Sequence, residues 1–361
     1  MFWVVGGLVV GLFVVSRVVT DRFGWSQWVW WVPAGWFVVV GWGFLMGSGL
    51  VGWLGKRRGW RGRRPVVLQG VLLVGCLGMG LNLVFGVWRV QNVIGGIHWT
   101  STYENGRVRV MHWNLSAGEI DVEKTVAWID ESNVDVVLIA NPRLDGQRRA
   151  LVEGLEGVVG EGGVVRRLPR GVVMSRFDVV ESSVVFVSAG GGGGGEDVMR
   201  ATGDFGWVAM LKFDLGEGEE LGVWFVDLPS EPGVHRMELI GRVAGLLEAR
   251  AEGVRPALIV GDFNTVRGSG SLGLFDVFED GAGFVDAFEE RGLGNGGSWR
   301  PGGLTGVKGW VAGRSGWGID LSLVGNGWRA GGYELLMPDG GDWGGLGGLS
   351  HRAQVVDLIF D

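Results

Sequence analysis

The chain has 361 residues, a formal net charge of −7 and a single cysteine, Cys76. Residues 1–100 hold nine Lys/Arg against one acid, Asp21, a net of +8, so residues 101–361 carry −15. An acidic C-terminal part disfavours tight, sequence-independent binding of DNA or RNA, because such binding depends on Lys and Arg neutralising phosphates. One cysteine also excludes a disulfide within the chain and leaves the redox compartment open.

Three long apolar stretches occupy the first hundred residues, at about 2–19, 28–54 and 66–88. A helix needs about 20 apolar residues to cross the hydrocarbon core of a bilayer, and each stretch approaches or exceeds that length. We therefore expect residues 1–100 to form an anchor of three transmembrane helices. A signal peptide is the alternative for the first stretch, but the stretch lacks a basic start and a clear cleavage site, and two more apolar stretches follow it.

A basic cluster between the second and third stretches sets the expected orientation. It consists of Lys56, Arg57, Arg58, Arg61, Arg63 and Arg64. Because short loops rich in Lys and Arg stay cytoplasmic, the N-terminus is expected in the cytoplasm and everything after Arg89 outside, as in a bacterial inner-membrane protein. The stretches carry no acid or His at their centres, which disfavours a transporter or channel.

Residues 101–361 are predicted to form one α/β domain, because short β-rich runs alternate with amphipathic stretches. Helices are expected at 121–132 and 234–251. The Gly190–Gly195 tract is expected to be a flexible surface loop. Strands are expected at 107–113, 134–140, 171–175, 178–187, 205–213, 221–227, 256–261, 319–324 and 352–360.

Polar residues stand at the ends of four predicted strands, where the catalytic side chains of α/β domains gather. Asn114 ends the first strand, and Asp262 and Asn264 follow another. Asp320 opens a third strand, and His351 directly precedes the last one. Taken singly, an Asp-x-Asn is often turn chemistry and a lone His or buried Asp is often structural. The joint pattern, in this order, indicates a catalytic site.

These segments resemble the conserved blocks of the endonuclease/exonuclease/phosphatase superfamily, which includes abasic-site endonucleases, DNase I-like nucleases, sphingomyelinases and inositol-polyphosphate phosphatases. The resemblance covers about residues 105–361, and it implies a four-layer α/β sandwich of two packed β-sheets flanked by helices, with phosphoester hydrolysis as the activity. The matching segments are Trp113-Asn114, Gly261-Asp262-Phe263-Asn264, Ile319-Asp320 and Ser350-His351, with Ser298-Trp299-Arg300-Pro301 similar to a Thr-Trp-Pro segment of many bacterial members.

The resemblance also implies a role for each matching side chain. Asn114 would lie at the metal and phosphate site. Asp262 would position or activate the attacking water, and Asn264 would donate hydrogen bonds to the phosphoryl oxygens. His351 would act as general base or contact the phosphate, and Asp320 would hold its imidazole in one tautomer. Positioning and electrostatic stabilisation of this kind are the main needs of phosphoester hydrolysis.

The sequence departs from the family pattern at three positions. The family ends its second block with Gln-Glu, where the Glu is the principal Mg²⁺ ligand, and this chain has Asn141 there. Asp227 stands where the family usually has His, and Ser350 stands where it usually has Asp. Because Mg²⁺ prefers charged oxygen ligands, these changes preserve the phosphate-binding residues and the general base better than the metal ligands.

We expect Mg²⁺ or Mn²⁺ at Asn114, with Asn141 and Asp227 as replacement ligands. A local shift of the alignment would recruit Glu119 or Glu123 in place of Asn141, although both fit the exposed start of the helix at 121–132 better.

Two functions of different classes follow. The leading hypothesis is metal-dependent hydrolysis of phosphoesters by a membrane-anchored extracytoplasmic domain, with small phosphoesters or lipid headgroups favoured over nucleic acid by the acidic charge. The other is a catalytically degenerate, membrane-tethered binding or scaffold domain. A local basic groove would bring nucleic acid back as a substrate, although edge-strand arginines in contact with solvent are the simpler interpretation. The candidates are Arg166, Arg167, Arg170 and Arg176.

Overall fold

The protein is described from a computed structural model, which carries most of the chain. The described residues are 2–30, 32, 34–57, 66–87, 89, 107–116, 118–142, 145–187, 205–231, 233–249, 255–276, 283–293, 296–299, 317–337 and 351–360. The expected loop at Gly190–Gly195, and also Arg300, Pro301 and Ser350, lie outside these ranges.

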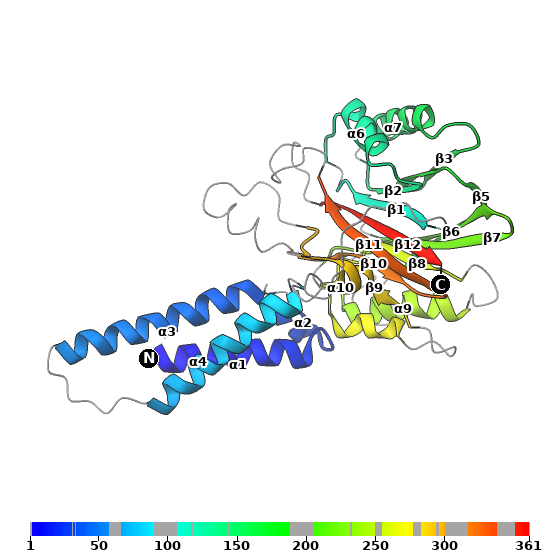
Figure 1. The fold of residues 1–361 in the computed structure, drawn as a ribbon. Coiled ribbons are helices and arrows are strands. Elements are labelled where there is room, and N and C mark those ends of the chain that lie inside the picture. The colour runs from blue at the N-terminus through cyan, green and yellow to red at the C-terminus, as the bar shows by residue number, and fades with distance from the viewer. Residues whose placement is uncertain are drawn as a thin grey trace.

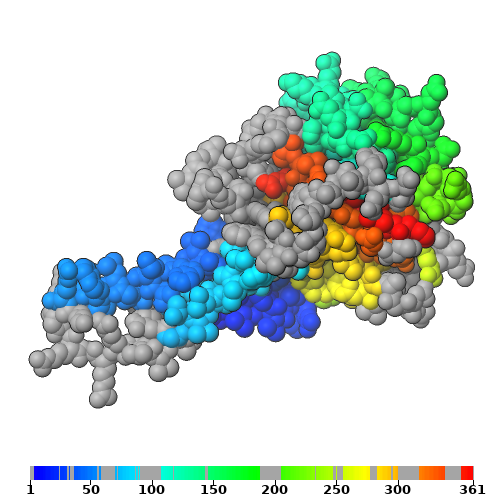
Figure 2. All heavy atoms as spheres, in the orientation of Figure 1, coloured from blue at the N-terminus to red at the C-terminus, as the bar shows by residue number. Residues whose placement is uncertain are grey.

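The N-terminal part is helical and projects from the rest of the molecule as an arm (Figures 1 and 2). Its long helices pack on one another through Phe13, Phe37, Leu72 and Met79, which surround the buried Cys76. The helices are α1 (Phe2–Val19), α2 (Gly24–Trp30), α3 (Ala34–Arg57) and α4 (Val66–Leu81), followed by the π-helical turn η1 (Asn82–Val87).

The expected anchor of three transmembrane helices is supported at one helix. Among the described residues, the 19-residue segment Trp36–Leu54 of α3 is long and apolar enough to cross a membrane. The helices Val4–Val19 and Leu72–Phe85 are apolar but shorter. The expected second span, 28–54, starts within α2 and continues into α3.

The strands of the described residues form two six-stranded mixed sheets. The first sheet has the order β11-β12-β1-β2-β4-β3. Its strands are β1 (Arg107–Asn114), β2 (Val136–Ala140), β3 (Val164–Leu168), β4 (Gly171–Ser175), β11 (Trp328–Leu336) and β12 (Ala353–Phe360). The second sheet has the order β5-β6-β7-β8-β10-β9. Its strands are β5 (Asp178–Val187), β6 (Gly206–Gly216), β7 (Glu219–Asp227), β8 (Leu258–Asp262), β9 (Val285–Asp286) and β10 (Asp320–Val324).

The two sheets pack face to face, and helices cover their outer faces (Figure 1). The inner core joins side chains of both sheets, among them Leu138, Trp207 and Phe225, all fully buried. Outer clusters pack the first sheet against α6 (Val122–Glu131) and α7 (Asp145–Val158), and the second against α9 (Arg236–Ala249) and the 3₁₀ turn η2 (Gly270–Phe275). A short α10 (Ala287–Arg291) follows β9. The expected α/β sandwich of two packed sheets is therefore confirmed.

Candidate active site

Four of the predicted polar residues meet at one end of the sandwich because of the strand directions. The strands β1 and β2 are parallel, with Asn114 opposite Ala140, so that Asn141 follows at the same edge. The strands β7 and β8 are also parallel, with Asp227 opposite Asp262. The carboxyl ends of parallel strands meet at one edge, which places an amide pair on one sheet beside a carboxylate pair on the other.

The end of β8, which carries Asp262, requires a glycine. Gly261 has φ +152°, and a Cβ at this position would collide with the carbonyl oxygen of Val226 on the neighbouring strand. A residue with a side chain would therefore force β7 and β8 apart. Gly261 thus lets the two strands approach closely just where both present an acid.

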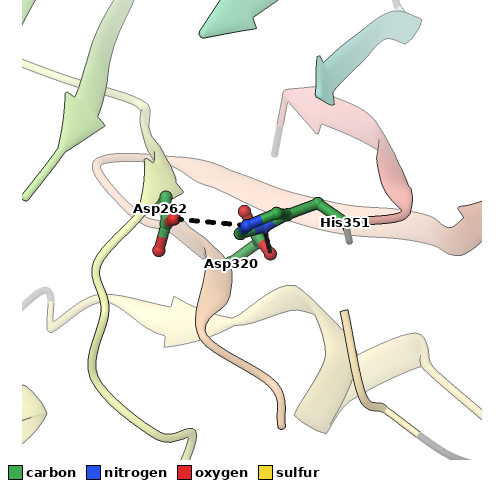
Figure 3. A group of neighbouring side chains, drawn as sticks. All are labelled: Asp262, Asp320 and His351. Atoms are coloured by element: carbon green, nitrogen blue, oxygen red, sulfur yellow. Dashed lines mark hydrogen bonds and ion pairs between the residues drawn. The ribbon is translucent and has the colours of Figure 1, made fainter. Parts of the chain in front are cut away.

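Asp262, Asp320 and His351 form one buried group (Figure 3). Asp320 opens β10 in register with Asp262 at the end of β8. The Nδ1 of His351 lies 2.9 Å from Asp320 Oδ2, and its Nε2 lies 3.9 Å from Asp262 Oδ2. The imidazole therefore stands between two acids that come from neighbouring strands, with one ring nitrogen committed to Asp320.

The charges of this group shift one another. Burial raises the pKa of Asp262 well above its ordinary value, and the carboxylates of Asp320 and Asp227 raise it further. Burial lowers the pKa of His351, but the neighbouring carboxylates, Asp320 foremost, outweigh burial and raise it. Burial disfavours the charged form of Asp320, yet the imidazole of His351 holds the pKa of Asp320 below its ordinary value. The pair Asp320–His351 is thus stabilised as carboxylate and imidazolium, whereas the charged form of Asp262 is disfavoured.

The segment Ser298-Trp299 supports this pair. The hydroxyl of Ser298 accepts a hydrogen bond from the backbone N–H of Asp320 at 2.9 Å. Trp299 forms an isolated β-bridge with His351, and the indole N–H of Trp113 donates to the His351 carbonyl at 3.2 Å. The segment therefore fixes the backbone on both sides of the acid–imidazole contact.

A second polar group, of amides and carboxylates, adjoins the first. Asn114 donates from its amide nitrogen to Asp262 Oδ2 at 2.8 Å. Asn141 donates to Asn114 Oδ1 at 3.3 Å and to both carboxylate oxygens of Asp227 at 3.2 and 3.1 Å. The indole of Trp207 also donates to Asp227, at 3.0 Å. The three residues expected to hold a metal therefore form a chain of contacts, in which Asn141 joins Asp227 to Asn114, and Asn114 reaches Asp262.

Trp207 is a site contact that the sequence did not reveal. It lies within β6 and is fully buried in the core between the sheets, so its position indicates a core residue and gives no sign of a polar partner.

Asn264 lies at the site, but its side chain has another partner. Its backbone N–H donates to Asp262 Oδ1 at 2.8 Å, and its amide nitrogen donates to the carbonyl of Leu228 at 2.7 Å. The residue has φ +46°, a left-handed conformation that Asn tolerates. Asn264 thus ties the loop after β8 to the loop after β7, and a phosphate contact would require its amide to exchange partners.

Glu119 and Glu123, the alternative ligands, are both exposed, and Glu123 lies in the first turn of α6. Asn141 is the residue that contacts Asn114.

Three of the four arginines of the possible basic groove bind neighbouring protein groups, and Arg167 is exposed. Arg166 donates to the carbonyl of Val179, and Arg170 donates to the carbonyl of Phe205. Arg176 donates to the side chain of Asn133. These contacts tie strands and loops together.

The donor set fits a divalent cation. Asp227, Asp262 and Asp320 place three buried carboxylates around the one imidazole of His351, and Asp227 and Asp320 both disfavour charge on Asp262. A cation would neutralise that excess, and carboxylate and amide oxygens are the ligands that hard divalent cations prefer. Asn141 would then turn its carbonyl oxygen towards the ion in place of the NH₂ group that now donates to Asp227.

A second arrangement of possible ligand atoms is formed by Asp262, Asp320 and His351, whose atoms all lie within 4.8 Å of one another. Because Asp320 already binds the imidazole, this trio suits proton transfer better than metal binding.

A buried acid–imidazole pair beside a carboxylate–amide cluster, at one end of a two-sheet α/β sandwich, defines a hydrolase-type catalytic domain. The chain belongs to the endonuclease/exonuclease/phosphatase family, whose model matches residues 111–345, more than half of the chain. The expectation of a phosphoric ester hydrolase is in line with this family.

Solved structures share the fold. A family protein from Bacteroides thetaiotaomicron is 14% identical, with 72% of this chain and 100% of that chain covered and a TM-score of 0.50. A mannosyl-6-phosphatase from B. thetaiotaomicron VPI-5482 is also 14% identical, covering 70% and 100% at a TM-score of 0.50. TDP2 from C. elegans is 13% identical, covering 79% and 85% at 0.50. No protein of curated function matches the chain.

Proposed function

We propose that this chain is a membrane-anchored phosphoesterase that hydrolyses a phosphoester bond with the help of Mg²⁺ or Mn²⁺. One observation carries the proposal: Asn114, Asp262, Asp320 and His351 converge on one buried site although they lie on four separate segments, with Asn141 and Asp227 in contact beside them. Family membership supports phosphoester hydrolysis as the reaction class.

Each residue has a task that follows from its contacts. The Nε2 of His351 faces Asp262, so a water held at Asp262 lies within reach of an imidazole that can take or return a proton. Asp320 fixes the tautomer through Nδ1. Asn114 and Asn264 offer amide donors to phosphoryl oxygens as negative charge builds. A cation held by Asp227, Asp262, Asn114 and Asn141 would supply further neutralisation of that charge.

A membrane anchor is supported by the exterior of the N-terminal arm. The segment Trp36–Leu54 has 17% of its residues buried inside the structure, so most of this apolar helix is exposed. The helices α1 and α4 pack beside α3, and they expose large apolar side chains such as Leu8 and Leu77. Exposed apolar surface along all three helices favours contact with lipid, and all three are proposed to lie in the membrane.

The orientation of the arm supports an extracytoplasmic catalytic domain. The N-terminal ends of α1 and α4 and the C-terminal end of α3 lie away from the sheets (Figure 1). In the sequence, the basic cluster at residues 56–64 begins in the last residues of α3 and precedes α4, and it marks a cytoplasmic side. The N-terminus is then cytoplasmic, and the domain faces the periplasm or the cell exterior of a bacterium.

The substrate proposed is a small phosphoester or a lipid headgroup. Residues 101–361 carry a net charge of −15, which disfavours a long nucleic acid. Three of the four arginines that were candidates for a basic groove, Arg166, Arg170 and Arg176, bind neighbouring protein groups.

A catalytically degenerate, membrane-tethered binding domain is the competing proposal. It rests on Asn141, whose neutral amide occupies the position at which the family's pattern has its metal-binding Glu. In that case the contact between Asn141 and Asp227 replaces the metal as the element that neutralises Asp227.

Hydrolysis of bis-p-nitrophenyl phosphate and p-nitrophenyl phosphate by the full chain tests the proposal. The assay is run with Mg²⁺, with Mn²⁺ and with EDTA, beside the variant Asp262→Ala/His351→Ala. Metal-dependent turnover that the variant loses supports the phosphoesterase. Absence of turnover together with absence of metal binding by calorimetry supports the tethered binding domain instead.

A further inference from the structure

The segment between α1 and α3 is bound to two loops of the catalytic domain. The carboxylate of Asp21 accepts hydrogen bonds from the backbone N–H of Ser271 at 3.1 Å and from its hydroxyl at 2.5 Å. The indole N–H of Trp30 donates to the hydroxyl of Ser269 at 2.8 Å. Gln27 donates to the carbonyl of Val234 at 3.4 Å. The side chains of Asp21, Gln27 and Trp30 are all buried, so the contact is a packed interface and no loose tether.

Both loops begin at residues of the candidate site. The loop after β7 starts directly after Asp227, and the loop after β8 starts after Asp262. They are joined at their origin, because Leu228 donates from its backbone N–H to the carbonyl of Asp262 at 2.8 Å and accepts from Asn264 at 2.7 Å. The arm is therefore attached at the end of the sandwich that holds the site, and α2 lies between the arm and the sheets (Figure 1).

The buried Arg236 fastens the first of these loops. Its guanidinium donates to the carbonyls of Pro229 and Glu231 at 2.6 and 3.1 Å, and its backbone N–H donates to Gln27 at 3.4 Å. One residue thus links the loop after Asp227 to α2.

The same segment presents aromatic side chains on another face. Phe23, Trp25 and Trp28 are 55%, 59% and 55% exposed, whereas Trp30 is 6% exposed. The rings of Phe23 and Trp25 stack at 6.2 Å. Indole rings concentrate at the level of lipid headgroups, and the apolar segment Trp36–Leu54 begins a few residues later. The position and chemistry of these rings therefore fit the interface between membrane and water.

The stretch of chain between the site and the attachment point of Trp30 is short. Asn264 and Ser269, the partner of Trp30, are five residues apart, which limits their separation to at most about 18 Å of extended chain. The site therefore lies close to residues 20–30 and on the side of the domain that carries the arm. If these residues sit at headgroup level, the site is positioned for an ester at the membrane surface.

We propose that residues 20–30 form a two-sided plate, which seats Phe23, Trp25 and Trp28 among the lipid headgroups and holds the site loops with Asp21, Gln27 and Trp30. The substrate is accordingly a phosphoester borne by a lipid-like molecule in the same membrane. This inference rests on the proposed phosphoesterase function and names its substrate class.

The test compares esters that differ in their alkyl chain. The full chain is reconstituted in nanodiscs of zwitterionic lipid. It is assayed with hexadecyl p-nitrophenyl phosphate in the disc and methyl p-nitrophenyl phosphate in solution, and with hexadecyl phosphate and methyl phosphate as the monoester pair. The expected result is a kcat/KM at least tenfold higher for the hexadecyl member of the pair that is hydrolysed. Hydrolysis without such a preference overturns this inference and leaves the proposed phosphoesterase function standing. If neither the diester pair nor the monoester pair is hydrolysed, the inference and the phosphoesterase function are both overturned.

Variants of the plate separate membrane positioning from simple support of the fold. The change Asp21→Ala/Trp30→Ala is expected to lower the ratio of hexadecyl to methyl kcat/KM at least tenfold, because the domain loses its fixed attachment. Equal loss on both esters, with the ratio unchanged, would mean that the plate merely stabilises the loops, and would overturn the proposal. Glu220→Ala, at the opposite end of β7, is the matched control and leaves the ratio as in the parent chain.

Discussion

The Nδ1 of His351 binds Asp320 Oδ2 at 2.9 Å, which leaves Nε2 directed at Asp262, 3.9 Å away. The carboxylate of Asp320 accepts a hydrogen bond from the Nδ1–H of His351, so the ring can expose a basic Nε2 on the side of the reacting water. Both residues are buried, and the raised pKa of His351 follows from the carboxylates around it, which outweigh the effect of burial.

Replacing Asp320 with Asn is therefore expected to reverse the imidazole. The new amide donates to Nδ1, so Nε2 keeps the proton and cannot accept one, and kcat falls by roughly 10²- to 10⁴-fold. Loss of the Asp320 charge also lowers the pKa of His351, so the acid limb of the remaining activity moves to lower pH. Steady-state kinetics from pH 5 to 9 would measure both effects.

The control for this change is Asp286→Asn on β9, which removes a buried carboxylate paired with Arg267 and leaves His351 untouched. An equal fall in kcat in both variants would mean that the loss comes from weakened packing, and the tautomer argument would be abandoned.

A second prediction concerns the contact between Asn141 and Asp227. Asn141→Glu replaces an amide donor with a carboxylate 3.1–3.2 Å from another, which destabilises the metal-free protein by about 1–3 kcal/mol. Mn²⁺ relieves that repulsion, so the variant gains more in Tm on adding Mn²⁺ than the parent chain does. The double variant Asn141→Glu/Asp227→His keeps one acid and removes the repulsion. It should bind Mn²⁺ at least about tenfold more tightly than the parent chain, a gain of about 1.4 kcal/mol in binding free energy. Calorimetry measures the affinity; unchanged affinity in both variants would exclude these positions as ligands.

The sequence indicated the strand ends well and the contacts between sheets poorly. Each of the nine expected strands overlaps one in the structure, because continuous Val- and Ile-rich runs mark buried strands. The strands β3, β9 and β11 were missed: β3 contains Arg166 and Arg167, β9 has two residues, and β11 contains Gly331 and Gly332. Glycine and charge are depleted in strands, so these segments look like loops.

The helix α7 was missed for a related reason. It carries Gly146, Gly154 and Gly157, which lower helix propensity, and it is held by the burial of Leu151 and Leu155 against the first sheet. Tertiary packing decides its structure, and no local pattern reports that packing.

The contact between Asn141 and Asp227 could not be derived from the sequence. The two residues follow strands of different sheets, and their meeting depends on how the sheets pack face to face. The resemblance placed each residue in its block, and the replacement of Glu by Asn at one and of His by Asp at the other pointed to an altered site. Their partnership, and the part of Trp207 in it, required the three-dimensional structure.

A third prediction concerns Gly261, the residue before Asp262 in β8. Gly261→Ala places a Cβ against the carbonyl oxygen of Val226 at a backbone φ of +152°. The expected loss in the free energy of unfolding is about 2–4 kcal/mol, since strand and backbone must both yield. Denaturant unfolding measures it, beside Gly157→Ala on α7. An added Cβ there meets nothing within 4 Å, and the change is expected to be neutral or stabilising by up to about 1 kcal/mol. Similar stability of the two variants would contradict the role assigned to Gly261.

The last prediction follows from a second buried histidine, behind Asp320. His112 is fully buried, its Nδ1 lies 3.0 Å from the amide nitrogen of Gln354, and its ring packs on Phe225. Burial lowers the pKa of His112 to about 4, with the charge of His351 adding to the effect and that of Asp320 opposing it. In the unfolded chain the pKa returns to its ordinary value of 6.5.

The sign of the pH dependence follows from these two values. Between pH 6.5 and about 4 the unfolded state binds a proton that the folded state does not, so stability falls as the pH falls through this window. The slope reaches at most about 1.4 kcal/mol per pH unit, and the full window amounts to roughly 3 kcal/mol. Above pH 6.5 the imidazole is neutral in both states, and its contribution is constant.

Because the pKa values of other site groups, Asp262 and His351 among them, are shifted as well, the measurement compares two proteins. Urea unfolding of the parent chain and of His112→Gln, followed at four values from pH 7.5 to 4.5, gives two stability curves whose difference isolates His112. The difference is expected to shrink as the pH falls, since the parent chain alone loses stability through this residue. Parallel curves would mean that His112 has the same protonation in the folded and unfolded protein at each pH. The claim that a buried, neutral imidazole lies behind Asp320 would then be wrong.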